Sequence, residues 1–382
     1  MTVARVRRVR LRSYRSIVSC DVELPPLAFL VGPNGSGKSN FLDALGLVSD
    51  ALRTGSLTQA LRTRGGVGQV ATRPYAAERT VLVAFDLDLA DGSAGYFFEF
   101  TPRGSARLIV DEFCTVNPAD SASNRYFHVQ RGRVTTSEAA LPDPGPGRLY
   151  LTSAASQPVF EPVYDLLASM SFYDFSVSAI KAPQVPELGD RLSADGGNLA
   201  SVLGRMRADK RLPDAIVEYL GVITPGVVNV DSTDRDGFVT LSVTQERGGK
   251  PVTFPAQSVS DGTLRALAVL TAGFQDAPGL VGIEEPETGI HPAAAAVLRE
   301  ALFEASANRQ ILLTSHSPEL LDDPELPPET VIAVQAADGV TRLGPLDRAG
   351  RMALRERLFT AGELLRLDQL APEDAVQDAA GR

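Results

Sequence analysis

In the first thirty residues, apolar side chains either alternate with charged ones or follow one another without a break. Val9 and Leu11 alternate with arginines, which predicts a strand with one apolar and one charged face. The run Leu27-Ala-Phe-Leu-Val31 is apolar throughout and of strand length, as expected for a strand buried on both faces. Residues 3–31 are therefore expected to form short β-strands.

Helical and strand patterns share the rest of the chain. Residues 158–218 have a mostly helical pattern, and residues 222–255 are expected to form strands with hairpin turns at Asp236-Gly237 and Gly248-Gly249. The other expected elements are a helix at 38–52, a loop at 53–75, strands at 80–89, 95–101 and 107–116, a Pro/Gly-rich surface excursion at 117–148, alternating helices and strands onward to His316, and a helical acidic end at 346–382. The last dozen residues are a candidate for disorder.

Composition narrows the class of protein. Of the 382 residues, 37 are Lys or Arg and 47 are Asp or Glu, so the net charge of −10 excludes a simple basic nucleic-acid binder and leaves only a local basic face open. The two cysteines, Cys20 and Cys114, form no Cys-x-x-Cys pattern, which favours reduced thiols in the cytoplasm over a disulfide framework or a zinc site. No uninterrupted apolar stretch reaches 18 residues, so neither a transmembrane helix nor a membrane partner is expected.

Residues 32–39, Gly-Pro-Asn-Gly-Ser-Gly-Lys-Ser, fit the phosphate-loop pattern G-x-x-x-x-G-K-[ST]. The loop follows a buried strand and opens a helix, so its backbone N–H groups and the positive end of the helix can surround phosphates. Lys38 is expected to contact the β- and γ-phosphates, and Ser39 to bind Mg²⁺. The alternative is a glycine-rich turn with an unrelated lysine. Lysine occurs only four times in the chain, which makes this match more informative.

Residues 280–285, Leu-Val-Gly-Ile-Glu-Glu, form a short apolar strand that ends in two carboxylates. This is the form of a Walker B element, in which a buried parallel strand delivers acids to Mg²⁺ and to the attacking water. Glu284 is expected to hold the metal shell through water, and Glu285 to act as the general base. The first acid is usually Asp, which leaves direct metal ligation by the longer Glu284 open. The alternative is a strand that ends in solvated surface charge.

Two weaker motifs flank this strand. Ser260-Asp-Gly-Thr-Leu-Arg265 precedes a helical run, and taken alone Ser260 is a helix N-cap. Leu313-Thr-Ser-His-Ser317 is an apolar strand that runs into His316, and a lone histidine is more often structural than catalytic. Their order around Glu284 and Glu285 is what gives them weight.

Together these motifs resemble those of an ATP-binding-cassette (ABC) ATPase of the SMC/RecF/OLD type, within the broad AAA-like group of ATPases. The residues that carry the resemblance are G-P-N-G-S-G-K-S-N at 32–40, S-D-G-T-L-R at 260–265, I-E-E-P-E-T-G-I-H-P at 283–292 and T-S-H-S-P-E at 314–319. The string E-E-P-E followed by H-P is especially similar to the ATPase half of OLD nucleases. The resemblance implies an α/β fold, namely a P-loop NTPase built as an ABC-ATPase head with a mixed β-sheet and a helical insertion.

The resemblance also assigns roles. It implies that Glu285 and His316 are catalytic, and that Ser39, Glu284 and Gln69 serve Mg²⁺. Gln69 resembles the Q-loop of SMC proteins, and its alternative is a polar loop glutamine. The residues implied to contact ATP are Asn34, Gly35, Ser36, Gly37, Lys38, Ser39, Asn40 and Gln69 in one subunit, and Ser260, Asp261 and Gly262 across a dimer interface.

Asp261 and Thr263 depart from the transporter signature, which has Gly and Gln at these places. The six arginines between residues 5 and 15 are expected to form a solvated strand face, with phosphate contact to DNA or nucleotide as the alternative. His128 and His291 are expected to be structural, His291 through packing or capping.

The expected function is ATP binding and hydrolysis coupled to an ATP-dependent homodimer, acting in DNA repair or anti-phage defence. DNA and a separately encoded nuclease or toxin are candidate partners. The first alternative is a regulatory ATP-binding subunit with little turnover that gates such a nuclease or toxin. A transporter subunit is disfavoured by the Asp-Gly-Thr signature, and a P-loop kinase leaves the signature and His316 unexplained.

Four parts are expected along the chain. They are an N-terminal lobe with the phosphate loop at 1–150, a helical insertion or lid at 151–218, a C-terminal lobe with the signature, the Walker B strand and His316 at 219–345, and a helical acidic tail at 346–382. The two lobes must pack together, because the phosphate loop and the Walker B acids act on the same nucleotide.

Overall fold

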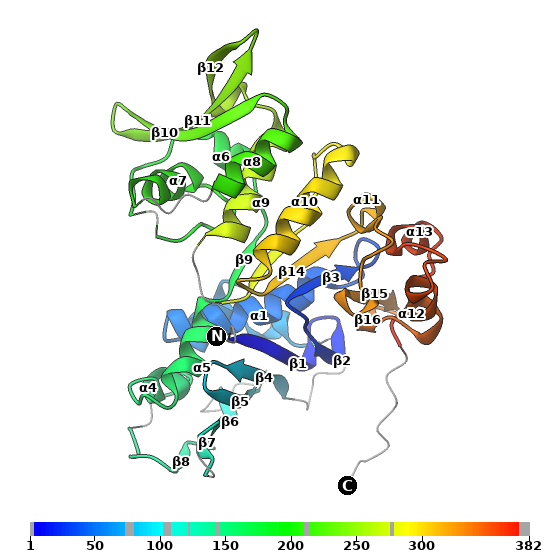
Figure 1. Cartoon of the computed structure of the whole chain (residues 1–382). Helices are drawn as coiled ribbons and strands as arrows, with labels where there is room; N and C mark the ends of the chain where they lie inside the picture. The colour runs from blue at the N-terminus through cyan, green and yellow to red at the C-terminus, as the bar shows by residue number, and fades with distance from the viewer. Residues whose placement is uncertain are drawn as a thin grey trace.

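The computed structural model describes residues 4–72, 80–101, 108–120, 123–142, 145–188, 190–209, 214–275 and 279–373. Across these ranges the strands form a thirteen-stranded mixed sheet, in the order β8-β7-β6-β5-β4-β1-β2-β16-β15-β3-β14-β13-β9, and a separate three-stranded sheet, β10-β11-β12. Figure 1 shows the small sheet at one end of the molecule, with helices between it and the large sheet.

The centre of the large sheet is parallel and buried. Its parallel strands are β9 (Ser171–Tyr173), β13 (Val281–Glu284), β14 (Ile311–Ser315), β3 (Leu27–Val31) and β15 (Val331–Ala337). Every residue of β3 and of β14 is buried, as expected for parallel strands covered by helices on both faces.

The two faces of β3 belong to two separate cores. Ala28 and Leu30 pack in the core that contains α1 (Lys38–Arg53). Leu27, Phe29 and Val31 pack in the core that contains α9 (Asp261–Phe274) and α10 (Pro292–Ala305). Because side chains alternate across a strand, five consecutive apolar residues serve both cores. Pairing of β3 with β14 and β15 confirms that the two ends of the chain pack as one sheet.

A mostly antiparallel wing, in which only the described pair β16–β2 is parallel, continues the sheet beyond β15. Its strands are β16 (Val340–Pro345), β2 (Ile17–Glu23), β1 (Arg5–Tyr14), β4 (Val81–Leu89), β5 (Gly92–Phe100), β6 (Ile109–Pro118), β7 (Arg125–Gln130) and β8 (Arg133–Thr136). The strands predicted at 80–89, 95–101 and 107–116 are thus confirmed as β4, β5 and β6.

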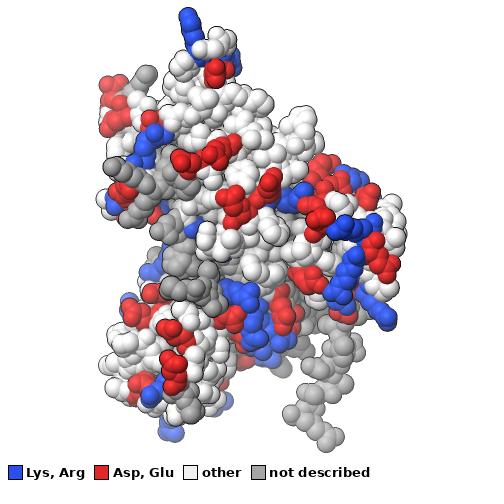
Figure 2. All heavy atoms as spheres, viewed as in Figure 1, with Lys and Arg blue, Asp and Glu red and all other residues white. Residues whose placement is uncertain are grey.

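The N-terminal arginines lie opposite acidic residues of the neighbouring elements. The ion pairs are Arg5–Asp88 (2.8 Å), Arg7–Asp88 (3.6 Å), Arg8–Asp21 (2.5 Å), Arg10–Asp86 (2.7 Å), Arg12–Glu99 (2.5 Å) and Arg15–Asp43 (2.8 Å). Figure 2 shows basic and acidic side chains side by side over β1. The arginines of β1 therefore form the charged strand face that the sequence predicted, and acidic partners balance their charge, whereas Arg15 follows β1 and pairs with Asp43 of α1.

The upper part of the molecule in Figure 1 combines short helices with the small sheet. Its elements are α6 (Val177–Lys181), α7 (Leu199–Ala208), α8 (Asp214–Ile223), β10 (Val227–Arg235), β11 (Phe238–Arg247) and β12 (Lys250–Pro255). Asp236, Gly237, Gly248 and Gly249 all have positive φ, so both predicted hairpin turns are confirmed.

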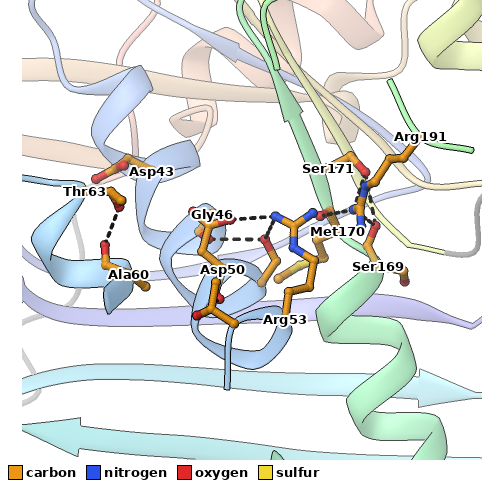
Figure 3. Close-up of polar contacts among 12 residues, drawn as sticks. Asp43, Gly46, Asp50, Arg53, Ala60, Thr63, Ser169, Met170, Ser171 and Arg191 are labelled. Atoms are coloured by element: carbon orange, nitrogen blue, oxygen red, sulfur yellow. Dashed lines mark hydrogen bonds and ion pairs between the residues drawn. The ribbon is translucent and has the colours of Figure 1, made fainter. Parts of the chain in front are cut away.

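β9 is a strand that the helical pattern of 158–218 did not predict. Three residues carry too little periodicity to signal a strand, and parallel pairing with β13 is what holds β9 in the sheet. Figure 3 shows the Arg191 side chain beside Ser169, Met170 and Ser171, where β9 begins. Its guanidinium donates to the carbonyl oxygens of Ser169 and Met170 and to the hydroxyl of Ser171, at 2.7, 2.7 and 2.6 Å.

Two expected loops contain regular structure. The segment 53–75 holds α2 (Leu57–Arg62), which Ser56 caps by accepting from the Gln59 amide at 3.2 Å, and α3 (Val67–Val70). The surface excursion at 117–148 holds the β7–β8 hairpin, turned by Arg131 and Gly132 at positive φ. In both segments Gly and polar residues flank elements of only four to six residues, which is too short for a clear pattern.

The C-terminal end is helical as predicted. The remaining elements are α4 (Leu151–Ala154), α5 (Glu161–Ser169), α11 (Pro318–Leu321), α12 (Arg348–Arg355), α13 (Ala361–Arg366) and two 3₁₀ turns at Ala256–Ser258 and Pro328–Thr330. The expectation of disorder falls mainly on residues 374–382, which lie outside the described residues. Within the described part of the chain, no helix has the length and apolar character needed to cross a membrane.

Candidate functional site

Three motif segments meet at the carboxyl ends of adjacent parallel strands. β3 runs into the phosphate loop, β13 ends at Glu284, and β14 ends at Ser315 with His316 next in the chain. The register pairs Val31 with Ser315 and Glu284 with Thr314, so the three strands end at the same level. The sheet thus brings together residues that are about 250 positions apart in the sequence.

The phosphate loop has the backbone that its glycines allow. Gly35 and Gly37 have φ of +78° and +105°, a region that disfavours residues with a Cβ atom. A Cβ at Gly37 would lie 2.0 Å from Thr341 Oγ1, and one at Gly32 would lie 1.9 Å from the Val334 carbonyl oxygen. α1 starts directly after Gly37, so its first N–H groups face the loop. This backbone fits a phosphate group, because the free N–H donors and the positive end of the helix dipole both face the loop and favour an anion there.

Lys38 lies across the loop that contains it. Its Nζ donates to the carbonyl oxygens of Gly32 at 2.7 Å and of Pro33 at 3.0 Å, and the residue is only 6% exposed. Burial lowers the pKa of Lys38, while the negative charges of nearby Glu285, Glu287 and Glu284 oppose that shift. A cation is thus held among loop carbonyls and acids before any phosphate binds.

Ser39 and Glu284 form a hydroxyl–carboxylate pair beside the loop. The Ser39 hydroxyl donates to Glu284 Oε2. Burial raises the pKa of Glu284, and the bond from Ser39 opposes that rise. The described residues hold no cluster of three or more His, Cys, Asp or Glu side chains that could bind a metal by themselves. One hydroxyl and one carboxylate, completed by phosphate oxygens and water, nevertheless fit Mg²⁺, which rarely uses an all-protein cage.

Glu285 has an unusual backbone conformation. Its φ is +43°, which is costly for a residue with a Cβ atom. Thr314 holds its amide, which donates to the Thr314 carbonyl at 3.1 Å and to Thr314 Oγ1 at 3.2 Å. Arg265 donates to the Glu285 carbonyl at 3.4 Å. This backbone turns the Glu285 side chain toward His316, whose Nδ1 lies 3.0 Å from Oε1.

Glu287 is a buried residue that holds the chain next to His316. Its Oε1 accepts from Ser315 Oγ at 2.5 Å, and Ser315 Oγ in turn accepts from the Ser317 amide at 3.0 Å. The two bonds fix the chain on either side of His316. Burial raises the pKa of Glu287, and the bond from Ser315 opposes that rise. No role was predicted for Glu287 from the sequence, although its place in the string Glu284-Glu285-Pro286-Glu287 is a signal that it lies near the site.

The predicted signature lies at the start of α9. Ser260 is its N-cap, and Ser260 Oγ accepts from the Thr263 amide at 3.2 Å and lies 2.6 Å from Thr263 Oγ1. A Cβ at Gly262 would lie 2.4 Å from the carbonyl oxygen of Gly289, so glycine allows α9 to pack against the segment after the Walker B acids. The N-cap reading of Ser260 is thus confirmed, and it leaves the signature role open.

The other predicted site residues differ in their exposure and in their hydrogen bonds. Asn34, Gly35 and Ser39 are exposed, whereas Ser36 is buried. Asn40 Nδ2 donates to Ser16 Oγ at 2.6 Å, and Gln69 is exposed on α3.

Sequence reasoning missed Ser16 and Thr341, which support the loop. Thr341 Oγ1 donates to the Ser36 carbonyl at 2.8 Å and lies 2.7 Å from Ser16 Oγ. No motif marks either residue, because their role arises from the pairing of β16 with β2.

The two other histidines have structural contacts. His128 Nε2 lies 2.8 Å from Asp111 Oδ1 on the neighbouring strand. His291 caps α10 by accepting from the Ala293 amide at 3.2 Å through Nδ1. Both observations agree with the structural roles that the sequence predicted.

Comparison with known proteins gives one family match and one curated relative. A family model described as "AAA domain, putative AbiEii toxin, Type IV TA system" matches residues 27–128 and 178–322. The Old nuclease of Escherichia phage P2 is 24% identical over 365 residues, which cover 84% of this chain and 58% of that protein. The chain thus spans little more than half the length of this relative.

Solved structures with a similar fold include SMC head domains. An SMC head bound to the C-terminal domain of ScpA, from Pyrococcus furiosus, has a TM-score of 0.57 at 13% identity and covers 93% of this chain and 99% of that chain. An SMC head bound to the C-winged helix domain of ScpA has a TM-score of 0.56 at 14% identity, with 89% and 97% covered. These likenesses confirm the predicted fold, a P-loop NTPase of the ABC-ATPase head type.

Proposed function

Because the chain belongs to the AAA-domain family described as putative AbiEii toxin, Type IV TA system, we propose that it binds ATP with Mg²⁺ and hydrolyses it. Within that family, its relatives place it with the ATPases of the SMC/OLD-like AAA type. One observation carries the proposal. The phosphate loop, the Ser39–Glu284 pair and the Glu285–His316 pair meet at the ends of three adjacent strands. The three groups correspond to phosphate binding, metal binding and activation of water.

The phosphate loop holds the triphosphate in this proposal. Backbone N–H groups of residues 35–39 donate to phosphate oxygens, and Lys38 exchanges its two carbonyl contacts for the β- and γ-phosphates. Ser39 and Glu284 hold Mg²⁺, Glu284 directly or through water. When bound, Mg²⁺ neutralises the charge that develops on the phosphate oxygens. Gln69, which is exposed on α3, would be a further ligand in the metal shell.

Glu285 takes the proton of the attacking water. In this scheme His316 Nδ1–H donates to Glu285 Oε1, which leaves Oε2 for the water; a contact of His316 Nε2 with the γ-phosphate requires Nε2 to carry a proton as well. Among the described residues, Glu285 Oε2 accepts one long hydrogen bond, 3.3 Å, from Thr288 Oγ1. The strained backbone of Glu285 thus serves to aim one carboxylate oxygen at the water.

A nucleotide-dependent homodimer is the second element of the proposal. Ser260 and Gly262 contact the γ-phosphate bound by the partner subunit, Asp261 lies between them at the start of α9, and Thr288-Gly289 lies at the interface. The contact of Gly262 with Gly289 supports this arrangement, because it joins the start of α9 to the segment that follows the Walker B acids.

The biological setting follows from the curated relative, which is named a nuclease. By analogy with that relative, we propose that the ATPase acts on or with DNA together with a nuclease or toxin, for which a separately encoded partner is the candidate. DNA repair and anti-phage defence in the cytoplasm are the processes that such a pair would serve.

Steady-state hydrolysis of ATP tests the proposal. The wild-type protein is expected to release phosphate only with Mg²⁺. Lys38→Ala is expected to lose ATP binding in calorimetry, and Glu285→Gln to bind ATP normally while turning over about 10²–10⁴-fold more slowly. Glu284→Gln is the matched control, and its expected defect is weaker Mg²⁺-dependent binding. Tight ATP binding by Lys38→Ala would overturn the phosphate-loop assignment.

Adding DNA to the same assay distinguishes the two candidate functions. If the protein is an active ATPase, it is expected to hydrolyse ATP either alone or when DNA is added. If the wild-type protein forms the ATP dimer but shows no turnover in either condition, a regulatory ATP-binding subunit is the better description.

A further inference from the structure

A lysine and an aspartate pair at the start of the signature helix. Lys181 is the last residue of α6, and its Nζ lies 2.6 Å from Asp261 Oδ1. Asp261 is the first residue of α9 and directly follows Ser260. The side chain of Asp261 is 69% exposed and that of Lys181 is 28% exposed, so the carboxylate faces outward and the lysine supports it from the protein side.

The fold holds Lys181 in this place by three contacts. Ser176 caps α6 by accepting from the Ala179 amide at 3.4 Å, and Ile180 is buried in the core that contains α9. Gln257, just before the signature, donates to the Lys181 carbonyl at 2.7 Å. The backbone of Lys181 is therefore fixed next to the signature, which lowers the entropy cost of keeping its side chain on Asp261.

Asp261 poses an electrostatic problem for the proposed dimer. The start of α9 is where the partner's γ-phosphate is expected to approach, and its N–H groups and dipole attract an anion there. An unpaired carboxylate at the first position of the helix would repel the phosphate. Glycine, which the transporter signature has at this position, creates no such conflict.

We propose that Lys181 neutralises Asp261 and so allows a signature with an acidic residue to accept the γ-phosphate of the partner subunit. Lys181 is a positioning residue in this scheme, and the inference rests on the proposed ATP-dependent dimer. It explains how the chain tolerates the acidic departure in its signature. It also predicts that the requirement for Lys181 disappears when Asp261 is made neutral.

A double-mutant cycle tests this relation. The dissociation constant of the ATP-bound dimer is measured by analytical ultracentrifugation in the Glu285→Gln background, which prevents turnover. Lys181→Ala is expected to raise that constant by roughly tenfold or more, and Lys181→Ala with Asp261→Asn to bring it back near the starting value. The loss in Lys181→Ala should shrink as salt screens the charges.

Two controls show whether the weaker dimer of Lys181→Ala arises from a general loss of positive charge or from a loss of ATP binding. Lys250→Ala removes the same charge from the exposed β11–β12 hairpin and should leave the dimer unchanged. ATP binding by monomeric Lys181→Ala, measured by calorimetry, should match that of its parent, because Lys181 makes no contact with the phosphate loop among the described residues.

The outcomes are distinct. An unchanged dimer in Lys181→Ala, or a double variant that remains as weak as Lys181→Ala, would overturn the inference while the proposed dimer stands. If the Glu285→Gln parent forms no dimer with ATP, the proposed dimer fails and the inference fails with it.

Discussion

At the scale of single residues, burial shifts the pKa of two acids near the phosphate loop. Glu284 and Glu287 lie close to Lys38, yet burial raises the pKa of both. For Glu287, Oε2 is buried without a hydrogen-bond partner among the described residues. The ionised form of Glu287 is therefore costly in this buried environment.

A prediction about the pH dependence of folding stability follows from Glu287. Its folded pKa is raised above the ordinary value of 4.5, so the folded state holds the proton more tightly than the unfolded state. Stability from this group is complete below 4.5 and is lost as pH rises through the raised folded value. Glu287→Gln cannot lose a proton and should gain stability relative to the wild type as pH rises.

Urea unfolding at several pH values between about 5 and 7.5 measures this difference. An offset between the two proteins that does not change with pH would contradict the burial argument. The offset itself can have either sign, because the glutamine amide also needs a hydrogen-bond acceptor.

At the scale of elements, α9 connects the signature to the Walker B region. Its N-cap hydroxyl is tied to Thr263, which in turn lies 2.9 Å from Thr224 Oγ1 at the end of α8. Its second residue, Gly262, packs on Gly289. A single helix thus carries a structural cap and a proposed phosphate contact on the same residue, Ser260.

Ser260→Ala separates these two roles, with Ser56→Ala as its match. Each serine caps a helix by accepting from the amide three residues later, at 3.2 Å in both cases. Each variant should therefore lose about 0.5–2 kcal/mol of stability. Only Ser260→Ala should also weaken the ATP-dependent dimer in ultracentrifugation. Equal dimer strength in both variants would leave Ser260 as a helix cap alone.

At the scale of the whole molecule, one buried glutamine joins the N-terminal strands to the C-terminal half of the chain. Gln310, just before β14, accepts from the Val6 amide at 2.9 Å and donates to the Val6 carbonyl at 2.8 Å. It also donates to the carbonyl oxygens of Leu24 and Pro25, both at 3.2 Å. These bonds connect β1 and the β2–β3 turn to the strand that leads to His316, so they fix the relative level of the strand ends.

Gln310→Leu should destabilise the protein because it leaves several buried backbone groups without partners. The expected loss is about 1–3 kcal/mol or more, measured by urea unfolding. Gln59→Leu, on the exposed surface of α2, is the matched control and should change stability by no more than about 0.5 kcal/mol. A similar small change in Gln310→Leu would show that strand pairing is what mainly holds the N-terminal strands to the C-terminal half.

The sequence determined the features that consecutive residues encode. The apolar run at 27–31, the glycines of the phosphate loop and the Asp236-Gly237 turn each act through local backbone geometry or local burial, so the buried strand, the loop before α1 and the hairpin could all be predicted. The order of four motifs was enough to predict the fold type. Ser260 as an N-cap followed from residue type and position alone.

Only the tertiary structure decided which distant groups meet. Four kinds of contact join residues from separate elements. They are the ion pairs of the N-terminal arginines, the bonds of Gln310 to the N-terminal strands, the support of the loop by Thr341 and the pairing of Lys181 with Asp261. Short elements such as β9 also depend on their neighbours, because three residues cannot stabilise a strand without an adjacent one. Such contacts arise from the three-dimensional register of the sheet, which a pattern along one chain does not contain.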